Sequence, residues 1–233
     1  MIPSEPNPQA EPHIRTFHPR RGRMGAVRAD ALARLWPERG YNIDPAGGAA
    51  FDPVGLFGRD APLVLEIGCG MGETTAAMAA ADPDRDYLGA DVHTPGLANL
   101  LALAERDRLA NVRAARGDAV ELLRDLMKPG SLAAVHVFFP DPWPKARHHK
   151  RRIVRPDVVT LMRERLAPGG LLHCATDWTP YAEQMLEVLG ADPGLRNTHS
   201  GYAPRPASRP VTKFERRALT AGREIFDLVF TRV

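Results

Sequence analysis

Residues 63–81, LVLEIGCGMGETTAAMAAA, run from an apolar stretch through a glycine-rich turn into a stretch of small and apolar residues. An almost continuous apolar run such as 63–68 is typical of a strand that is covered on both faces. The alanines that follow the turn favour a helix. The stretch therefore predicts a strand, a tight turn and a helix, which is the unit from which open α/β sheets are built.

Strands and helices alternate on both sides of this unit. Leu97, Leu100, Leu101 and Ala104, for example, fall on one helical face. We expect strands at 63–68, 87–92, 111–118, 133–140, 171–177 and 225–230, and helices at 28–40, 74–81, 97–104, 119–127, 157–170, 182–189 and 212–222. This alternation predicts the α/β class, with a doubly wound, mostly parallel sheet and helices on both faces.

Composition indicates one large domain with an extension. The chain has 233 residues, of which 44% are hydrophobic and 25% are charged. We expect residues 1–25, rich in proline and charge, to form a flexible arm, and residues 26–233 to form a single domain. Because no apolar run approaches the length of a membrane span, and the first residues lack the apolar core of a secretion signal, we expect a cytoplasmic protein.

The two cysteines, Cys69 and Cys174, lie in apolar, strand-like surroundings. Neither has a partner at the spacing of metal ligands, so the sequence predicts no metal site. Both are expected to be buried free thiols.

Acidic residues mark the ends of five expected strands. They are Glu66, Asp91, Asp118, Asp141 and Asp177. The carboxyl ends of parallel strands lie along one edge of a sheet, and ligands bind there near the point where the strand order reverses. The sequence therefore predicts a row of carboxylates along one edge.

The turn after the first of these strands carries Gly68, Gly70 and Gly72, and Glu73 stands where a dinucleotide fingerprint would place its third glycine. Glycines let a ligand approach the backbone, but carboxylates are poor neighbours for a pyrophosphate. They suit S-adenosylmethionine (SAM), whose sulfonium and ammonium groups are cationic. Asp91 would then accept hydrogen bonds from the ribose hydroxyls and Asp118 from the adenine amine. The alternative is that these glycines and acids are only turn and cap residues.

Residues 137–152, VFFPDPWPKARHHKRR, place Asp141 between two prolines that fix its backbone. A carboxylate there can accept the N1–H and the exocyclic amine of guanine. Methylation of guanine N7, a lone pair without a proton, needs alignment with the sulfonium rather than a strong base. The alternative roles are a turn carboxylate for Asp141 and a packed rim aromatic for Trp143.

Positive charge is concentrated in two segments. Residues 145–155 hold six lysines and arginines, residues 15–28 hold five arginines, and neither segment contains an acid. Such patches attract phosphate even though the net charge of the chain is only +3. The alternative is a basic surface that is merely solvated.

Near the carboxyl terminus, Thr212 and Glu215 stand three residues apart, the spacing of a helix capping box. Capping and contact with a substrate are both compatible with this pattern.

The sequence resembles the bacterial tRNA (guanine-N7-)-methyltransferases. The resemblance rests on LEIGCGMG, GADVHTPG, GDA, FFPDPWPKARHHKRR, ATDW and RPVTKFERR, which follow the order of that family over residues 63–217. The stretches FFPDPW and TKFE are specific to the family, whereas the glycine turn alone is not. The resemblance implies a class I methyltransferase fold with a seven-stranded sheet. It also implies transfer of a methyl group from SAM to N7 of guanosine 46 in the variable loop of tRNA.

The resemblance also implies roles for individual residues. Asp141 would be catalytic, and SAM would bind at Glu66, Gly68, Gly70, Gly72, Asp91, Asp118 and Asp141. The substrate would contact Lys145, Asp177, Thr212, Lys213, Phe214 and Glu215, and RNA would contact Arg147, His148, His149, Lys150, Arg151 and Arg152. The chain departs from the family pattern at Asp91, where glutamate is common, and at Pro144, where histidine is frequent.

Two other functions remain open on the sequence alone. One is a methyltransferase of the same fold that acts on another nucleobase, in rRNA or DNA. The other is a non-catalytic RNA-binding protein that has kept the fold. Glu73 and the surplus of acids disfavour a nicotinamide-dependent dehydrogenase. The sequence leaves open whether the protein is a monomer or a homodimer.

Overall fold

The computed structural model describes residues 16–17, 24–47 and 49–233. The predicted arm at 1–25 therefore lies mostly outside the described residues. The rest of the chain is built around one eight-stranded sheet with the strand order β1-β4-β3-β2-β5-β6-β8-β7.

Six strands of the sheet are parallel. They are β1 (Gly40–Asn42), β2 (Leu63–Ile67), β3 (Asp86–Asp91), β4 (Val112–Arg116), β5 (Leu132–Phe138) and β6 (Leu166–Thr176). The last two strands, β7 (Leu195–Asn197) and β8 (Phe226–Arg232), are antiparallel, β8 to β6 and β7 to β8. The chain builds outward from β2 to β3 and β4, then returns to place β5 on the other side of β2. The strand order therefore reverses between β2 and β5.

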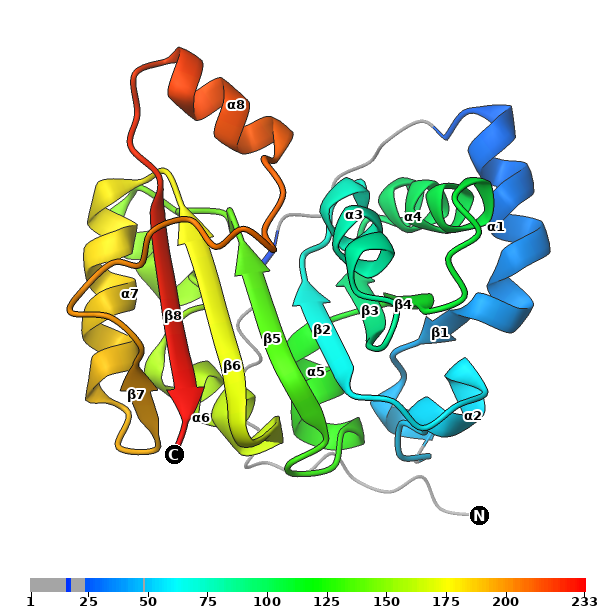
Figure 1. The fold of residues 1–233 in the computed structure, drawn as a ribbon, viewed down its shortest axis with the longest axis horizontal. Helices are drawn as coiled ribbons and strands as arrows, with labels where there is room; N and C mark the ends of the chain where they lie inside the picture. Colours follow the sequence, from blue (N-terminus) through cyan, green and yellow to red (C-terminus); the bar gives the residue numbers. More distant parts are fainter. Residues whose placement is uncertain (1–15, 18–23, 48) are drawn as a thin grey trace, which may run out of the picture.

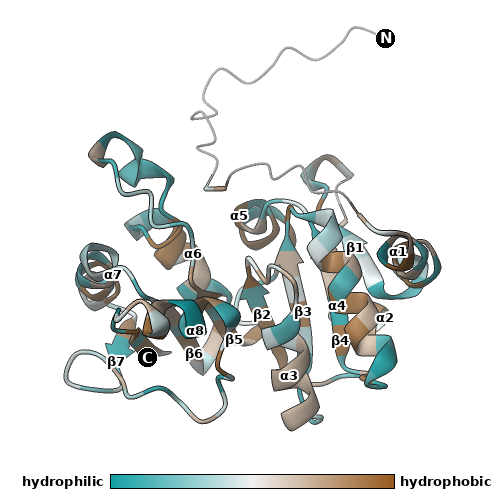
Figure 2. Cartoon of the chain, turned by 90° about the horizontal axis from the view of Figure 1, so that it is seen from above, coloured by the Kyte–Doolittle hydropathy of each residue, from teal (hydrophilic) through white to brown (hydrophobic). Residues whose placement is uncertain are grey.

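Helices cover both faces of the sheet (Figure 1; Figure 2). One face carries α3 (Glu73–Ala81) and α4 (Thr94–Arg106), with α1 (Ala26–Arg39) beside α4 at the edge. The other face carries α5 (Ala119–Glu121), a turn of π-helix at 122–126, α6 (Pro156–Arg165) and α7 (Thr179–Ala191). Short helices at Pro45–Gly47, α2 (Pro53–Phe57) and Ala146–Arg151 lie in connections. Helix α8 (Lys213–Thr220) stands above the carboxyl ends of β5 and β6 (Figure 1).

The alternating side chains of β2 divide the interior into two cores. Leu63, Leu65 and Ile67 pack with the helices on the α5–α7 face. Val64 packs on the opposite face, with residues of α3 and α4. All five residues of β2 are buried, so the near-continuous apolar run reflects a strand covered on both sides.

The predicted fold class is confirmed, and the boundaries differ at particular places. The sheet has eight strands rather than seven, because the three-residue β1 adds to the edge at β4. The helix predicted at 157–170 ends at Arg165, and β6 begins at Leu166. Pro168 has no N–H and disfavours a helical conformation at the residue before it, so the sequence at 166–168 does not favour a longer helix. The loops expected after Gly190 contain β7.

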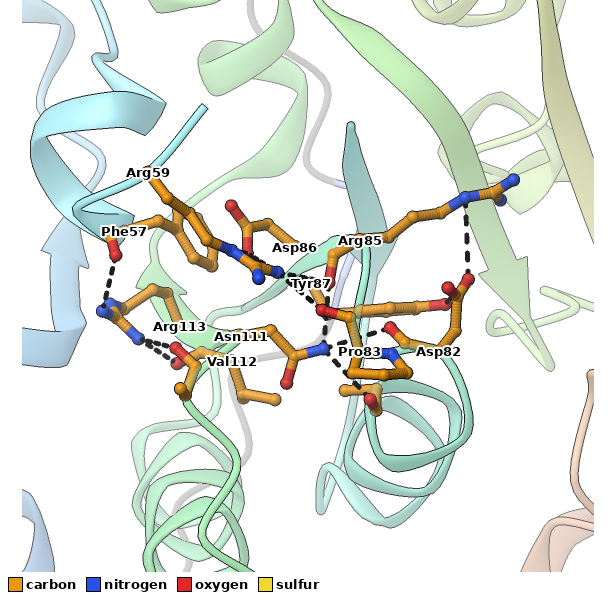
Figure 3. A network of polar contacts seen from close by, with 12 residues as sticks. Phe57, Arg59, Asp82, Pro83, Arg85, Asp86, Tyr87, Asn111, Val112 and Arg113 are labelled. Atoms are coloured by element: carbon orange, nitrogen blue, oxygen red, sulfur yellow. Dashed lines mark hydrogen bonds and ion pairs between the residues drawn. The ribbon is translucent and has the colours of Figure 1, made fainter. Parts of the chain in front are cut away.

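A polar network ties the amino ends of the central strands together, at the edge opposite the carboxyl ends (Figure 3). The side-chain amide of Asn111 donates to the carbonyl oxygens of Ala79 and Arg85, at 3.0 and 2.9 Å. The guanidinium of Arg59 donates to the buried Asp86 carboxylate at 2.8 Å. The Asn111 bonds satisfy backbone carbonyls at the end of α3 and in the turn that leads into β3, and the Arg59 bond pairs a buried carboxylate.

Candidate active site

A pocket opens at the carboxyl ends of β2, β3, β4 and β5, where the strand order reverses. Its lining includes Gly68 and Gly70 from the turn after β2 and the carboxylates Asp91, Asp118 and Asp141 from the ends of the other three strands. Parallel pairing of these strands brings the acids to one edge, as the sequence predicts. The described lining does not include Glu66, Gly72 or Asp177.

The glycine turn has a backbone that other residues rarely adopt. Gly68, Gly70 and Gly72 have φ angles of 74°, 58° and 74°, in the left-handed region that favours glycine. The turn is held by the amides of Gly68 and Cys69, which both donate to the carbonyl of Ala90 on β3. A Cβ on Gly72 would lie 2.5 Å from the Cβ of Leu100 on α4. The glycines therefore allow both the tight turn and the close approach of α4.

Gly96, near the start of α4, is a site residue that sequence reasoning missed. A Cβ at this position would lie 1.9 Å from the carbonyl oxygen of Gly70. Any larger residue would push the glycine turn away from its place in the pocket. The signal is present in the sequence as a glycine soon after a strand-end acid, but only the fold shows which backbone it faces.

Asp91 both joins the turns and lines the pocket. One carboxylate oxygen accepts the N–H of Gly70 at 2.8 Å, and the other accepts the N–H of His93 at 2.8 Å. Each carboxylate oxygen has two lone pairs, so these bonds leave acceptor capacity toward the pocket. The side chain thus ties the glycine turn after β2 to the end of β3.

Asp118 begins α5. Its carboxylate accepts the N–H of Val120 at 2.8 Å, which is the bond of a helix cap. The residue is 8% exposed and lies in the pocket lining. The cap role named as an alternative is therefore present, and it fixes the carboxylate at the pocket edge.

Glu66 lies behind the glycine turn, on the face of β2 that α3 covers. Its carboxylate accepts a hydrogen bond from the hydroxyl of Thr75 at 2.6 Å. Burial raises the pKa of Glu66 to about 7; the charge of Asp91 adds to the rise, and the Thr75 hydroxyl opposes it. Glu66 supports the turn from below and can exchange a proton near neutral pH.

The turn that presents Asp141 is strained on both sides. Phe139 has a φ angle of 51° and Trp143 one of 45°, values that bulky residues seldom adopt. Pro140 and Pro142 restrict the residues between them. Backbone strain of this kind gathers at functional sites, where the surrounding structure holds it in place.

The basic segment that follows, Lys145–Arg155, is divided between surface and interior. Lys145, Arg147, His149 and Lys150 are exposed. Arg151 lies over the ring of Trp143, with its guanidinium carbon 4.4 Å from the ring centroid, and His148 meets the same ring edge-on at 5.8 Å. Trp143 is only 5% exposed, so the expected packed aromatic is present and orients part of the basic segment.

Arg152 differs from the expectation that it contacts RNA, because it is 2% exposed. Its Nε donates to the carbonyl of Pro142 at 2.8 Å, and its Nη1 donates to the side-chain oxygen of Gln184. Its guanidinium lies 4.7 Å from the ring centroid of Tyr181. Arg152 holds the basic segment against α7 and does not offer its charge to a ligand outside.

The remaining predicted substrate residues follow β6 or lie at the start of α8. Asp177, after β6, forms an ion pair with Arg223 at 2.8 Å. The hydroxyl of Thr212 accepts the N–H of Glu215 at 3.0 Å and caps α8. The capping box is incomplete, because the Glu215 carboxylate binds Arg209 and is buried. Phe214 is 47% exposed and lines the pocket, and Lys213 is exposed beside it.

Sequence reasoning also missed several residues of the lining. Phe139 stacks on Phe214, with ring centroids 6.3 Å apart and ring planes 22° from parallel. Thr16 and Phe17 lie in the lining, and the indole N–H of Trp143 donates to the carbonyl of Thr16 at 3.4 Å. Nothing in the sequence pattern of the arm marks these two residues. The described part of the arm therefore reaches the site.

The part of the chain that the structure describes holds neither a metal-binding cluster nor a membrane-spanning helix. Within the ranges 16–17, 24–47 and 49–233, no group of three or more His, Cys, Asp or Glu side chains is arranged to hold a metal ion. In the same ranges, no helix has the length and apolar character needed to cross a bilayer. The two cysteines are buried free thiols, as expected.

Comparisons with known proteins agree with this geometry. A family model described as "Putative methyltransferase" matches residues 60–228. The tRNA (guanine-N(7)-)-methyltransferase of Streptomyces coelicolor is 59% identical over 225 residues, which cover 96% of this chain and 82% of that protein. The enzyme of the same name from Aromatoleum aromaticum is 53% identical, with coverage of 99% and 88%.

Solved structures are more distant. The crystal structure of the 16S rRNA methyltransferase KamB superposes with a TM-score of 0.60 at 18% identity, and covers 78% of this chain and 94% of that one. At this level of identity the likeness concerns the fold alone.

The buried Glu66 predicts how stability depends on pH when no ligand is bound. Between pH 4.5 and about 7 the folded protein keeps a proton on Glu66 that the unfolded chain releases, so the free energy of unfolding falls as pH rises. We expect Glu66→Gln to remove this fall, which is on the order of 3 kcal/mol. Urea unfolding of both proteins at pH 5, 6, 7 and 8 measures the difference. The control is Glu187→Gln, which changes an exposed residue on α7. If the free energy of unfolding of wild type and of Glu66→Gln changed with pH in the same way, Glu66 would not be the group that binds the proton.

Proposed function

The chain belongs to the family of tRNA (guanine-N7-)-methyltransferases, and from this membership we propose its reaction and the residues that serve it. It transfers the methyl group of SAM to N7 of a guanosine in tRNA. By the resemblance of its motifs, the guanosine is number 46, in the variable loop.

One observation carries the proposal. Carboxylates from the ends of β3, β4 and β5 meet the glycine turn of β2 in a single pocket, and an exposed basic segment begins directly beside it. Carboxylates inside the pocket attract a cationic methyl donor, and the lysine and arginine side chains outside it attract a polyanion. A dinucleotide or a metal would call for a different set of side chains.

The residues of the pocket fit SAM. The space where a Cβ of Gly68 would stand is open, so a ligand can lie against the backbone there. Asp91 would accept from the ribose hydroxyls and Asp118 from the adenine amine, as the sequence predicts. Bound SAM supplies a methyl group that its sulfonium makes electrophilic. Glu66, whose carboxylate accepts from Thr75 behind the glycine turn, would take part in SAM binding as the resemblance implies.

Asp141 would hold the guanine. Its carboxylate accepts from N1–H and from the exocyclic amine, two donors side by side on one edge of the base. N7 carries a lone pair and no proton, so the attack requires orientation more than proton removal. The methylated ring gains positive charge, which a fixed carboxylate in a pocket stabilises. The strained turn from Phe139 to Trp143 would keep Asp141 in position.

The tRNA backbone would contact the exposed part of the basic segment. Arg147, His149 and Lys150 offer their side chains to solvent, whereas Arg151 and His148 would act from the surface of Trp143. Lys145, Asp177 and the start of α8 would contact nucleotides close to the target base. Phosphate contacts of this kind set the register of the RNA without reading its sequence.

The proposal also covers the domain organisation and the cellular location of the protein. Residues 26–233 form one domain, which the single sheet and its two cores support. The protein works in the cytoplasm, where tRNA is modified and where thiols such as Cys69 and Cys174 stay reduced.

The most direct test identifies the product. The protein is incubated with methyl-labelled SAM and unmodified tRNA, the RNA is digested, and the labelled nucleoside is separated. We expect N7-methylguanosine, and a tRNA with adenosine in place of guanosine 46 should stay unlabelled. Label in another nucleoside, or in rRNA but not tRNA, would overturn the proposal.

Asp141→Asn should lower kcat/KM for tRNA by at least ~100-fold, because the amide loses the charge and one acceptor that the guanine edge needs. The fold should survive, since the change is nearly isosteric. Steady-state methyl transfer and circular dichroism measure the two effects. Asp107→Asn, an exposed carboxylate paired with Arg106, is the matched control. Methyl transfer at the wild-type rate by Asp141→Asn would remove the role assigned to this residue.

The exposed and buried arginines predict different salt dependence. In a plot of log K for tRNA binding against log salt, the double change Arg147→Ala with Lys150→Ala should reduce the slope by about 1.5. Arg152→Ala should lower the unfolding midpoint and leave the slope unchanged, because its charge lies inside. Filter binding at several salt concentrations separates the cases. The opposite pattern would mean that Arg152 reaches the RNA and that the exposed pair is only solvated.

A further inference from the structure

Arg209, in the connection between β7 and α8, is a charged residue with 0% exposure. Its Nε and Nη2 donate to the two carboxylate oxygens of Asp227 at 2.7 and 2.8 Å. Its Nη1 donates to Glu215 at 2.5 Å. His173 shares the Asp227 carboxylate through its Nε2 at 2.7 Å. We call these four residues the Arg209 cluster.

The Arg209 cluster contains buried ion pairs, from Arg209 to Asp227 and from Arg209 to Glu215. Burial by itself would raise the pKa of Asp227, but hydrogen bonds from His173 and Arg209 hold that pKa below its usual value. Buried ion pairs of this kind are weak contributors to stability, because well-packed apolar residues often serve as well or better. Their best-attested use is to fix one arrangement of the chain.

The cluster joins three parts of the chain that the sequence separates. Asp227 lies near the start of β8, opposite Ala175 near the end of β6. Arg209 lies in the segment that crosses the face of β8 and β6 before α8 rises above the sheet (Figure 1). Glu215 belongs to α8, where it and Ala218 are the only buried residues among Lys213–Thr220. Since alanine offers little surface, the bond from Arg209 to Glu215 is the closest polar contact that holds α8, and Arg205 adds a longer ion pair to Glu215 at 3.6 Å.

The same guanidinium reaches the pocket wall. Its carbon lies 5.9 Å from the ring centroid of Phe138 and 5.7 Å from that of Phe139, within the range of cation–π attraction. Phe139 has the strained backbone described above and stacks on Phe214 of α8. Phe138, Phe139 and Phe214 all lie in the pocket lining, beside Asp141. Arg209 thus holds α8 through Glu215 and faces the aromatic wall through the Phe139 ring.

We propose that Arg209 is a positioning residue for methyl transfer: it fixes α8 and the Phe139 ring so that Phe139 and Phe214 form the wall on which the target guanine stacks. The inference rests on the proposed function and adds a residue that touches neither SAM nor RNA. Aromatic faces are the usual platform for an unstacked base in an RNA-binding protein. Arginine can fill this role because its planar guanidinium donates to Asp227 and Glu215 at the same time. The ammonium group of lysine is a compact point charge and cannot reproduce this geometry.

The test is Arg209→Lys, which keeps the charge and loses the fork. We expect kcat/KM for tRNA to fall by about 10- to 100-fold, since a small displacement of a substrate wall costs this much. The dissociation constant for SAM, measured by calorimetry, should stay within about twofold because Gly68, Asp91 and Asp118 belong to other elements. The control is Arg165→Lys, another buried arginine, whose Nε donates to the carbonyl of Leu123 on the far side of the sheet. It should lower the unfolding midpoint without changing the tRNA kinetics.

A second pair of variants covers the case in which Arg209→Lys does not fold. Glu215→Gln removes one charge and leaves the Arg209–Asp227 pair intact; it should show the same split between tRNA kinetics and SAM affinity. Phe139→Leu should also reduce kcat/KM for tRNA, and its effect should shrink in the Glu215→Gln background, because both changes disturb one wall.

Three results would overturn the inference: unchanged tRNA kinetics in Arg209→Lys and Glu215→Gln, an equal loss of SAM affinity, or strictly additive effects. Failure of the wild-type protein to form N7-methylguanosine would instead overturn the proposed function.

Discussion

The hydrogen bond from the Gly70 amide to the Asp91 carboxylate joins the turns after β2 and β3, and the pocket depends on it. It fixes a glycine turn whose backbone no other residue type adopts easily. It also places a carboxylate where the strand order reverses, the point at which an open parallel sheet leaves room for a ligand. Glu66 and Gly96 serve the same turn from below and from α4, one by a hydrogen bond to Thr75 and the other by having no side chain.

Acidic and basic side chains occupy different places around this pocket. Asp91, Asp118 and Asp141 line the pocket, while Arg147 and Lys150 are exposed in the basic segment that follows Asp141. A cationic donor and a polyanionic substrate can therefore bind side by side without either meeting like charge. The basic segment starts directly after Asp141, and Trp143 and Arg152 fasten it to the body of the protein. Along the chain, the residue that would hold the base and those that would hold the RNA backbone are close neighbours.

The sequence predicts the parts of this arrangement that depend on local pattern and topology. The apolar run of β2, the glycine turn and the strand-end acids can be placed because parallel strands carry their carboxyl ends to one edge. The roles of Arg152 and Glu215 could not be predicted in this way. In the sequence, Arg152 does not differ from the other cations of the basic segment. Its burial follows from a hydrogen bond to Gln184, which lies 32 residues away in the chain. Glu215 fits a capping box, but its carboxylate turns to Arg209 instead. The strands β1 and β7 are three residues long and are defined by their partners rather than by their own pattern.

We propose that the carboxylates at one edge of the sheet form a shared site for the methyl donor and the guanine. A crystal structure with S-adenosylhomocysteine and guanosine 5′-monophosphate tests it most directly. We expect the nucleoside of the cofactor product to lie between Asp91 and Asp118, against Gly68, with the guanine edge on the Asp141 carboxylate. Ligand bound outside this pocket, or bound in it without contact to these acids, would show that the acids do not form a shared site.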